Sequence, residues 1–231
     1  MIELHQFPGR WGISSISPFC LKLETWMHMI ELDFKVVVGR STKANPKGKM
    51  PFIIHDGKMV ADSGLIVSYL KETFNVKLDD ALSKEQKAVG TAVTVMIEEH
   101  LYWAMVYSRW VDATYQQQFR TEVFSALPPV VRSLVPRMLS RNVAKTLHCQ
   151  GIGRHTRDEI YQLAIQDLEM LTVLLADQTY FFGKEPTSLD ATVFGFLANA
   201  LRPPMETPIK QYIASKQNLV AFVDRVQNRY Y

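Results

Sequence analysis

The spacing of hydrophobic and polar positions in the first third of the chain is typical of short strands. Residues 2–7 and 33–39 are apolar or β-branched runs of strand length. Residues 51–61 hold two further apolar runs that meet at Asp56-Gly57, a dipeptide typical of two-residue hairpins. This part of the chain is therefore predicted to form four strands.

Two helices are predicted between and after these strands. Pro18 opens a run of apolar residues with helical spacing, and Ser17 immediately before it is well placed to cap the first turn. A second helical run starts with Asp62 or Ser63 as its N-cap. The predicted order is βαβ followed by ββα, which gives an α/β unit with a parallel half and an antiparallel half.

Beyond residue 74 the strand-like alternation stops and long helical patterns take over. Residues 83–111 are predicted to form one long helix, and residues 157–177 a strongly amphipathic one. In the stretch between these two helices, from Val123 to His148, the prolines at positions 128, 129 and 136 are predicted to break the helical pattern. The predicted division is an α/β domain of residues 1–74, a linker of residues 75–82 and an all-helical domain of residues 83–231.

The composition is typical of a globular protein from a compartment in which cysteines stay reduced. Hydrophobic residues make up 47% and charged residues 21%, and there are only two cysteines. No apolar run reaches the ~18 residues that a membrane span needs, and the N-terminus has no secretory pattern. We therefore expect a cytoplasmic protein without a membrane partner.

The charge is unevenly distributed, although the formal net charge is only +3. Residues 123–157 contain six basic residues and no acidic one. This excess fits either a solvated helix face or a surface for an anionic partner. No aromatic residue lies between Phe124 and Tyr161, so the stacking residues of a single-strand site are missing and no nucleic acid is expected.

Two motifs resemble the signatures of the glutathione transferase family. Residues 45–70, "NPKGKMPFIIHDGKMVADSGLIVSYL", resemble the first, and residues 181–198, "FFGKEPTSLDATVFGFLA", resemble the second. The second begins a helix with Thr187 and Asp190 placed as a capping box. The resemblance implies a thioredoxin-like α/β N-terminal domain followed by an all-α C-terminal domain.

Three other segments resemble the branch that contains the failed axon connections proteins and the metaxins. These segments are "SPFCLKLETWMHM", "EEHLYWAMVYSRW" and "GIGRHTRDEIYQLAIQDLEML". Metaxins are associated with import at the mitochondrial outer membrane. The branch therefore implies an alternative in which the same fold serves as a non-enzymatic binding or scaffold protein.

The resemblance implies a glutathione site in the α/β domain. The Met50-Pro51 bond is expected to be cis, with the Met50 backbone paired to the cysteinyl backbone of glutathione. The start of the helix at Asp62 and Ser63, with the Ser63 hydroxyl, would hold the γ-glutamyl carboxylate, because free N–H groups and the positive end of the helix dipole favour an anion. Asp62 would meet the ammonium group of glutathione, across the site or from the partner subunit. One of three basic residues would meet the glycyl carboxylate: Arg40, Lys43 or Lys49.

The start of the first helix carries the group that would stabilise the glutathione thiolate. Ser17 occupies the position of the first cysteine in "C-P-F" relatives, so it is the predicted catalytic residue. Ser14 and Ser15 are alternative donors, because the length of the loop before the helix is open. Cys20 occupies the resolving position, but a serine at position 17 cannot pair with it in a disulfide, so two-thiol redox chemistry is not expected. Cys20 lies three residues into the helix and is predicted to be partly buried and inert.

A second binding surface is implied by aromatic residues in the long helix. They recur at spacings of three or four: His100, Trp103, Tyr107 and Trp110. They would either line an apolar pocket for an electrophile or pack between helices. The potential ligands between His148 and His155 match no zinc spacing, so no metal is expected.

The predicted function is conjugation of the glutathione thiolate to a small apolar electrophile. Glutathione would be the co-substrate, and the resemblance implies a homodimer. The alternative is the metaxin-like scaffold, which predicts a protein or anionic partner on the basic surface between Arg132 and Arg157.

Overall fold

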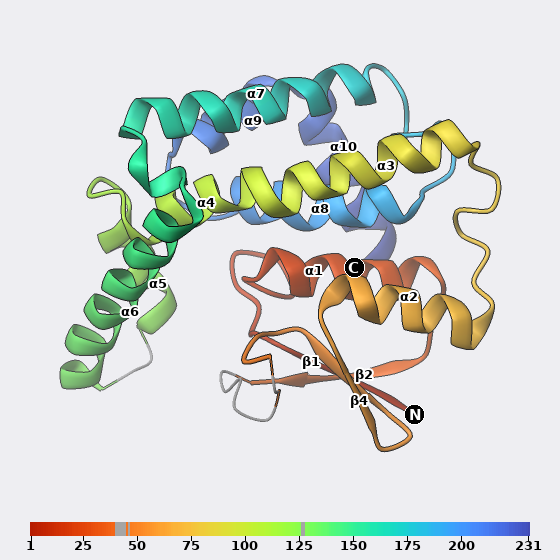
Figure 1. The fold of residues 1–231 in the computed structure, drawn as a ribbon, viewed down its shortest axis with the longest axis horizontal. Helices are drawn as coiled ribbons and strands as arrows, with labels where there is room; N and C mark the ends of the chain where they lie inside the picture. The colour runs from red at the N-terminus through yellow and green to blue at the C-terminus, as the bar shows by residue number, and fades with distance from the viewer. Residues whose placement is uncertain (40–44, 46, 126–127) are drawn as a thin grey trace. The chain divides into compact units, whose positions relative to one another are not determined.

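The computed structural model describes residues 1–39, 45, 47–125 and 128–231, and it shows two compact units (Figure 1). The sheet unit comprises Met1–Thr94, Leu174–Pro203 and Gln217–Tyr231. The helical unit comprises Val95–Val173 and Pro204–Lys216. These units are defined by contacts and differ from the predicted domains, whose limits stay a prediction.

The sheet unit contains a four-stranded sheet with the order β2-β1-β3-β4. β1 pairs in parallel with β2 and antiparallel with β3, and β4 closes the antiparallel hairpin. Leu4 lies opposite Val36 on one side and Ile53 on the other. The strands are β1 (Ile2–Gln6), β2 (Phe34–Val38), β3 (Phe52–His55) and β4 (Lys58–Ala61).

The β3–β4 hairpin turns where the sequence predicts. Asp56 and Gly57 both have positive φ, 48° and 80°, which is the backbone of a type I′ turn. Such a turn matches the right-handed twist of the flanking strands, so the dipeptide fixes the register of β3 against β4.

Two helices cover one face of the sheet, α1 (Pro18–Met29) and α2 (Ser63–Phe74) (Figure 1). The core between them is formed by fully buried apolar side chains from all three elements. It contains Ile2, Leu4, Leu23, Trp26, Met27, Ile53, Ile66 and Leu70. The predicted βαβ and ββα order is confirmed, and so is the thioredoxin-like fold that the family resemblance implies.

α8 (Ser188–Leu201) packs against the other side of α1, and Gly195 allows the close approach. A Cβ atom at position 195 would lie 2.7 Å from both the Pro18 carbonyl oxygen and the Lys22 nitrogen. Any side chain there would push the first turn of α1 away, so α8 sets the position of the helix that starts at Ser17. α10 (Gln217–Tyr230) also belongs to this unit.

The predicted long helix at residues 83–111 is continuous in path but not uniform. It runs as α3 (Lys84–Met96), a π-helical turn (Ile97–Leu101) and α4 (Tyr102–Trp110). A π turn inserts one extra residue into the helical repeat, which the spacing of apolar residues alone does not reveal.

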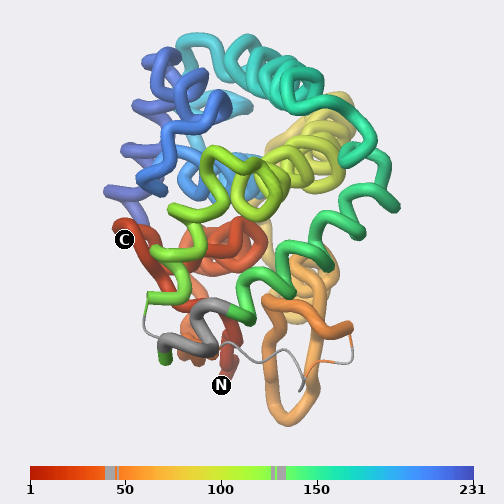
Figure 2. The backbone as a smooth tube through the Cα atoms, turned by 90° about the vertical axis from the view of Figure 1, so that its left-hand side faces the viewer, coloured from red at the N-terminus to blue at the C-terminus, as the bar shows by residue number. Residues whose placement is uncertain are grey.

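The helical unit corrects one prediction, because Pro136 does not break its helix. α6 runs from Pro129 to Gln150 and continues through Pro136 (Figure 2). A proline in a helix removes one N–H donor, and tertiary packing of the helix can outweigh that loss. The unit's other helices are α5 (Gln116–Phe124), α7 (Arg157–Leu175) and α9 (Pro208–Ser215), with a 3₁₀ turn at Ile152–Arg154.

Asp79 ties the segment after α2 to the start of α8. Its carboxylate accepts hydrogen bonds from the Ser188 backbone nitrogen at 2.8 Å and from the Ser188 hydroxyl at 2.6 Å. It also pairs with Lys71 Nζ at 2.6 Å. Burial opposes ionisation of this carboxyl, but the hydrogen bonds from Lys71 and Ser188 outweigh it and hold the pKa of Asp79 below its usual range.

We expect Asp79→Asn to lower the free energy of unfolding by about 1–3 kcal/mol at pH 7. A lowered folded-state pKa stabilises the fold above the ordinary value of about 3.9, and this stabilisation is lost as the pH falls through the folded value. Urea unfolding from pH 7 down to pH 3 should therefore show the two proteins converging in acid. Asp80→Asn is the control, since Asp80 is exposed and lies 3.5 Å from Lys77. If the difference in the free energy of unfolding between the wild type and Asp79→Asn stayed constant over this pH range, the prediction would be contradicted.

Candidate glutathione site

Ser17 is the N-cap of α1, as the sequence predicts. Its backbone is extended, with φ −98° and ψ 123°, and its Oγ accepts a hydrogen bond from the Cys20 backbone nitrogen at 3.4 Å. Pro18 follows at the first helical position, where its missing N–H costs nothing. The cap uses a lone pair of the Ser17 hydroxyl, so its proton is left for another acceptor.

The two neighbouring serines use their protons elsewhere. Ser15 is fully buried and donates its hydroxyl to the Phe7 carbonyl oxygen at 3.0 Å. The Ser14 hydroxyl donates to the buried carboxylate of Glu24, which also accepts from Gln6 Nε2 at 3.0 Å. The geometry therefore separates the three candidates. The hydroxyl protons of Ser14 and Ser15 are directed at oxygen acceptors in Glu24 and Phe7, whereas within the described residues the Ser17 hydroxyl donates to no oxygen and has the Cys20 thiol as its neighbour.

Cys20 lies behind this helix start and is fully buried, more completely than predicted. Burial raises the pKa of its thiol to about 11, although the hydrogen bonds from Ser17, Phe7 and Ser15 act in the opposite direction. Thiol chemistry needs the thiolate, so Cys20 is unreactive near neutral pH. Both cysteines are free, and Cys149 is the exposed one.

Met50 and Pro51 stand one step before β3, and the peptide bond between them is cis, as predicted. The Met50 side chain is buried against Cys20 and Phe52. Within the part of the chain that the structure describes, the N–H and C=O of Met50 form no hydrogen bond. These two groups are therefore open to the backbone of a bound peptide.

Asp62 and Ser63 begin α2, and of the two residues predicted as its N-cap the structure selects Asp62. Asp62 is the N-cap, and its Oδ1 accepts from the nitrogens of Gly64 at 3.0 Å and Leu65 at 3.2 Å. Its own φ is +88°, a backbone conformation that non-glycine residues rarely adopt and that is frequent at ligand sites. Ser63 is buried, and its N–H and hydroxyl have no partner among the described residues. The anion-binding groups left at this helix end are therefore those of Ser63.

Lys47 is a candidate site residue that the sequence-based predictions did not include. Its Nζ lies 3.1 Å from the Ala61 carbonyl oxygen, which places a cation one residue before Asp62. The buried Asn45 fixes this turn, because its Oδ1 accepts from the Lys47 nitrogen at 2.9 Å. The signal was present in "NPKGK", where the asparagine and glycine mark a turn that carries two lysines.

Of the three basic residues predicted for the glycyl carboxylate, only Lys49 is described. Its side chain is exposed, and its carbonyl oxygen accepts from Asn45 Nδ2 at 2.5 Å. Arg40 and Lys43 lie outside the described residues. The choice among the three stays open, with Lys47 as a fourth candidate.

The aromatic residues predicted on the long helix pack within the helical unit. The Tyr107 ring lies 6.1 Å from that of Tyr161, and the Trp110 ring lies 5.2 Å from that of Phe119. These contacts favour packing over an open pocket for the two residues. His100 differs, because its side chain is 44% exposed and its Nδ1 lies 2.7 Å from the buried carboxylate of Asp167.

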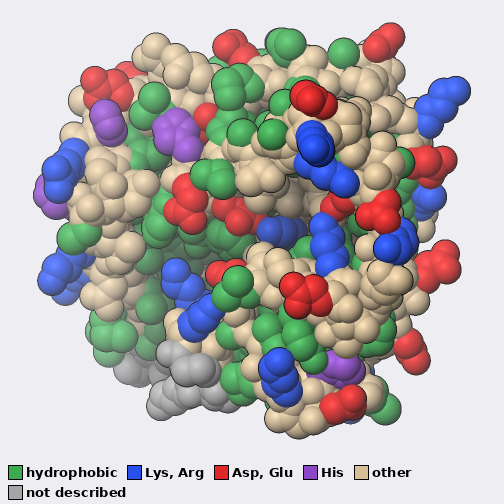
Figure 3. Space-filling view, turned by 45° about the vertical axis from the view of Figure 1, so that its right-hand side comes forward, with side chains coloured by type: hydrophobic (Ala, Val, Ile, Leu, Met, Phe, Trp, Pro, Cys, Tyr) green, Lys and Arg blue, Asp and Glu red, His purple; other side chains and the backbone are tan. Residues whose placement is uncertain are grey.

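The basic stretch is partly neutralised in the helical unit. Arg157 donates to Asp112 Oδ2 at 3.0 Å, beside the Tyr161 hydroxyl at 2.6 Å from the same oxygen. The exposed basic residues of α6 that are described are Arg137, Arg141 and Lys145. The side chain of Arg132 is not among those described. On the face drawn in Figure 3, Lys and Arg side chains are interspersed with Asp and Glu.

The fold and the site define a class of protein. A thioredoxin-like sheet is followed by a long helical segment, and the sheet unit contains a capped start of α1, a cis-proline turn before β3 and a capped start of α2. Family profiles match on both halves: the glutathione S-transferase N-terminal domain over residues 18–115 and its C-terminal domain over residues 164–226. The chain belongs to the glutathione S-transferase family.

The similar proteins include a glutathione S-transferase and proteins whose names do not describe an enzyme. Failed axon connections of Drosophila melanogaster is 30% identical over 99% of this chain, which spans 58% of that protein's length. The isoprene-epoxide–glutathione S-transferase of a Rhodococcus strain is 30% identical over the whole chain and 99% of its own length. Metaxin-2 of Homo sapiens is 28% identical over 98% of this chain and 87% of its own.

Solved structures agree on the fold. A glutathione S-transferase of Ceriporiopsis subvermispora, solved with glutathione, aligns with a TM-score of 0.70 at 16% identity, over 99% of this chain and 97% of that one. The beta-etherase LigF of Sphingobium aligns with a TM-score of 0.66 at 19% identity, over 97% and 94%. At these identities the likeness concerns the fold alone. Among the described residues no helix has the length and apolar character of a bilayer span.

Proposed function

We propose that this chain is a glutathione transferase that joins the glutathione sulfur to a small apolar electrophile. The observation that carries the proposal is the Ser17 hydroxyl at the N-terminus of α1, together with the Met50 backbone before the cis Pro51, whose N–H and C=O form no hydrogen bond within the described residues. The full-length similarity to an isoprene-epoxide–glutathione S-transferase supports it and suggests an epoxide as one class of electrophile. The free cysteines fit the cytoplasm as the compartment.

In this mechanism the protein binds glutathione as a peptide and stabilises its thiolate. The Met50 N–H and C=O pair with the cysteinyl backbone beside Pro51. The Ser63 N–H and hydroxyl bind the γ-glutamyl carboxylate, and Asp62 attracts the ammonium group. The N-terminus of α1 and the Ser17 hydroxyl donate to the sulfur, which lowers a thiol pKa from about 8.5 toward about 7. With an epoxide, the thiolate then attacks a ring carbon, so that a C–S bond forms as the ring C–O bond breaks, and the released oxygen takes up a proton from water.

We also propose a homodimer. Leu65 lies two residues after Ser63 in the first turn of α2, and it is 56% exposed. An apolar side chain so exposed beside the proposed site fits an interface with a second copy.

A scaffold role is the second candidate. It is supported by the metaxin relatives and by the exposed basic residues of α6, Arg137, Arg141 and Lys145. This candidate predicts a stable protein that binds an anionic partner and turns over no electrophile.

Calorimetric titration with reduced glutathione tests the proposal. We expect binding in the millimolar range or tighter, and we expect Ser63→Ala to weaken it about tenfold, because one hydrogen bond to a charged group is lost. Ser68→Ala is the matched control, since Ser68 is exposed in the same helix and its hydroxyl donates to the Gly64 carbonyl oxygen. A glutathione concentration of about 10 mM is enough to detect a dissociation constant in the millimolar range. If no heat of binding were observed at that concentration, the proposal would be contradicted and the scaffold role would be the remaining candidate.

A further inference from the structure

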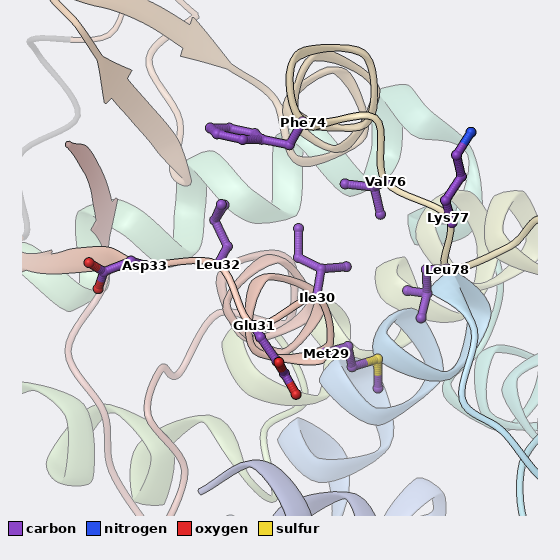
Figure 4. Close-up of a pocket in the computed structure, with 9 residues that line it drawn as sticks. All are labelled: Met29, Ile30, Glu31, Leu32, Asp33, Phe74, Val76, Lys77 and Leu78. Atoms are coloured by element: carbon purple, nitrogen blue, oxygen red, sulfur yellow. The ribbon is translucent and has the colours of Figure 1, made fainter.

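A pocket of about 390 Å³ lies in the sheet unit where α1 and α2 both end. Figure 4 shows four apolar side chains from these two ends directed toward one another: Ile30, Leu32, Phe74 and Val76. The volume falls in the range of about 300–1,000 Å³ that is usual for small-molecule sites. Ile30, Leu32 and Val76 form the apolar floor of the pocket, and their positions are fixed because they pack against the core of the unit.

The charged residues of this pocket stand at its rim. Glu31, Asp33 and Lys77 point away from the apolar floor (Figure 4). Lys77 lies 3.5 Å from Asp80, so its charge is offset. Glu31 and Asp33 are exposed, and neither forms an ion pair within the part of the chain that is described. The rim therefore has an excess of negative charge.

The two helix ends add to this potential. A helix carries a partial negative charge at its C-terminus, and both α1 and α2 end at the pocket. Their N-termini, at Ser17 and Asp62, belong to the proposed glutathione site. Each helix has 12 residues and is therefore ~18 Å long, so the two sites are well separated. Because α1 and α2 both run from the proposed glutathione site to the pocket, their dipoles favour anions at the first site and cations at the second.

We propose that this pocket binds small amphiphilic cations, that is, an apolar body with one ammonium or guanidinium group. The apolar body would lie on Ile30, Leu32 and Val76. The cation would stand at the rim between Glu31 and Asp33. The site is independent of glutathione, and its failure would leave the proposed transferase function untouched.

A series of three probes of one shape and different charge tests this proposal. The probes are 4-phenylbutylammonium, the neutral 4-phenylbutanol and the anionic 5-phenylpentanoate, titrated into the full chain at low salt. We expect the ammonium to bind with a dissociation constant on the order of 1 mM or lower, and the alcohol about fivefold more weakly. Equal affinity for all three, or no saturable binding of the ammonium, would overturn the proposal.

Variants locate the binding. The double variant E31Q/D33N keeps size and removes both charges, and it should weaken the ammonium about fivefold while leaving the alcohol unchanged. Glu72→Gln is the matched control, because Glu72 is an exposed carboxylate of α2 outside the pocket lining. Unchanged ammonium affinity in E31Q/D33N would place the binding elsewhere.

Val76→Trp should fill the pocket and abolish binding of the ammonium and the alcohol. If this variant does not fold, Phe74→Ala serves instead, since the Phe74 side chain is 43% exposed and its loss removes one wall. A folded variant of either kind that binds as tightly as the wild type would refute the site. Glutathione titration of the same variants should give wild-type affinity throughout.

Discussion

Replacing Ser17 with alanine is expected to lower the rate of glutathione conjugation about a hundredfold, with little change in glutathione affinity. The Ser17 hydroxyl is the donor that the proposed mechanism directs at the thiolate, so its loss raises the pKa of the bound thiol. Steady-state kinetics from pH 6 to pH 9, an interval of about three units around the ordinary thiol pKa, would show the loss and an upward shift of the pH profile.

The neighbouring serines supply the controls for this experiment. Ser14→Ala and Ser15→Ala remove hydroxyls that are bound to Glu24 and to the Phe7 carbonyl oxygen, so they should affect stability more than the pH profile. Ser17→Thr keeps a hydroxyl and a helix cap and should retain much of the rate. A Ser17→Ala enzyme with the wild-type rate and pH profile would exclude Ser17 as the thiolate donor.

Replacing Asp190 with alanine is expected to lower the free energy of unfolding by about 3–5 kcal/mol. The carboxylate is fully buried and accepts from three donors: the Phe181 nitrogen at 2.9 Å, the Thr187 nitrogen at 2.7 Å and the Thr187 hydroxyl at 2.7 Å. Alanine leaves these donors buried without an acceptor. Thermal unfolding followed by circular dichroism would measure the loss.

Asp158→Ala is the matched control for Asp190. Asp158 also stands in the first turn of a helix, α7, but its side chain is 93% exposed. Its removal should cost about 0.5 kcal/mol or less. If the two variants unfolded at the same temperature, the buried capping box would not have the importance that we assign to it.

Signals confined to a few residues predicted the fold well. The Asp56-Gly57 turn, the caps at Ser17 and Asp62, and the capping box from Thr187 to Asp190 are all found where the sequence predicts them. Each depends on backbone preferences and hydrogen bonds within three or four residues, so no knowledge of the tertiary structure is needed to find it.

Features that depend on distant contacts were missed or wrong. Pro136 was expected to break a helix that in fact continues, and the π turn at Ile97–Leu101 leaves no clear trace in the apolar spacing. The choice among Ser14, Ser15 and Ser17 depends on acceptors in other segments. The cation pocket is formed by two helix ends more than 40 residues apart, Met29 and Phe74, which no local pattern brings together.

The dependence of the α1 start on α8 has a consequence for how the protein is made. Asn199 Nδ2 donates to the Ser15 carbonyl oxygen at 3.2 Å, and Gly195 lies against the first turn of α1. The partners in this contact are 184 residues apart in sequence. A ribosome therefore releases the loop with Ser17 long before it makes the residues that hold the loop in place. The proposed active site, although encoded near the N-terminus, is completed only when most of the chain has been synthesised.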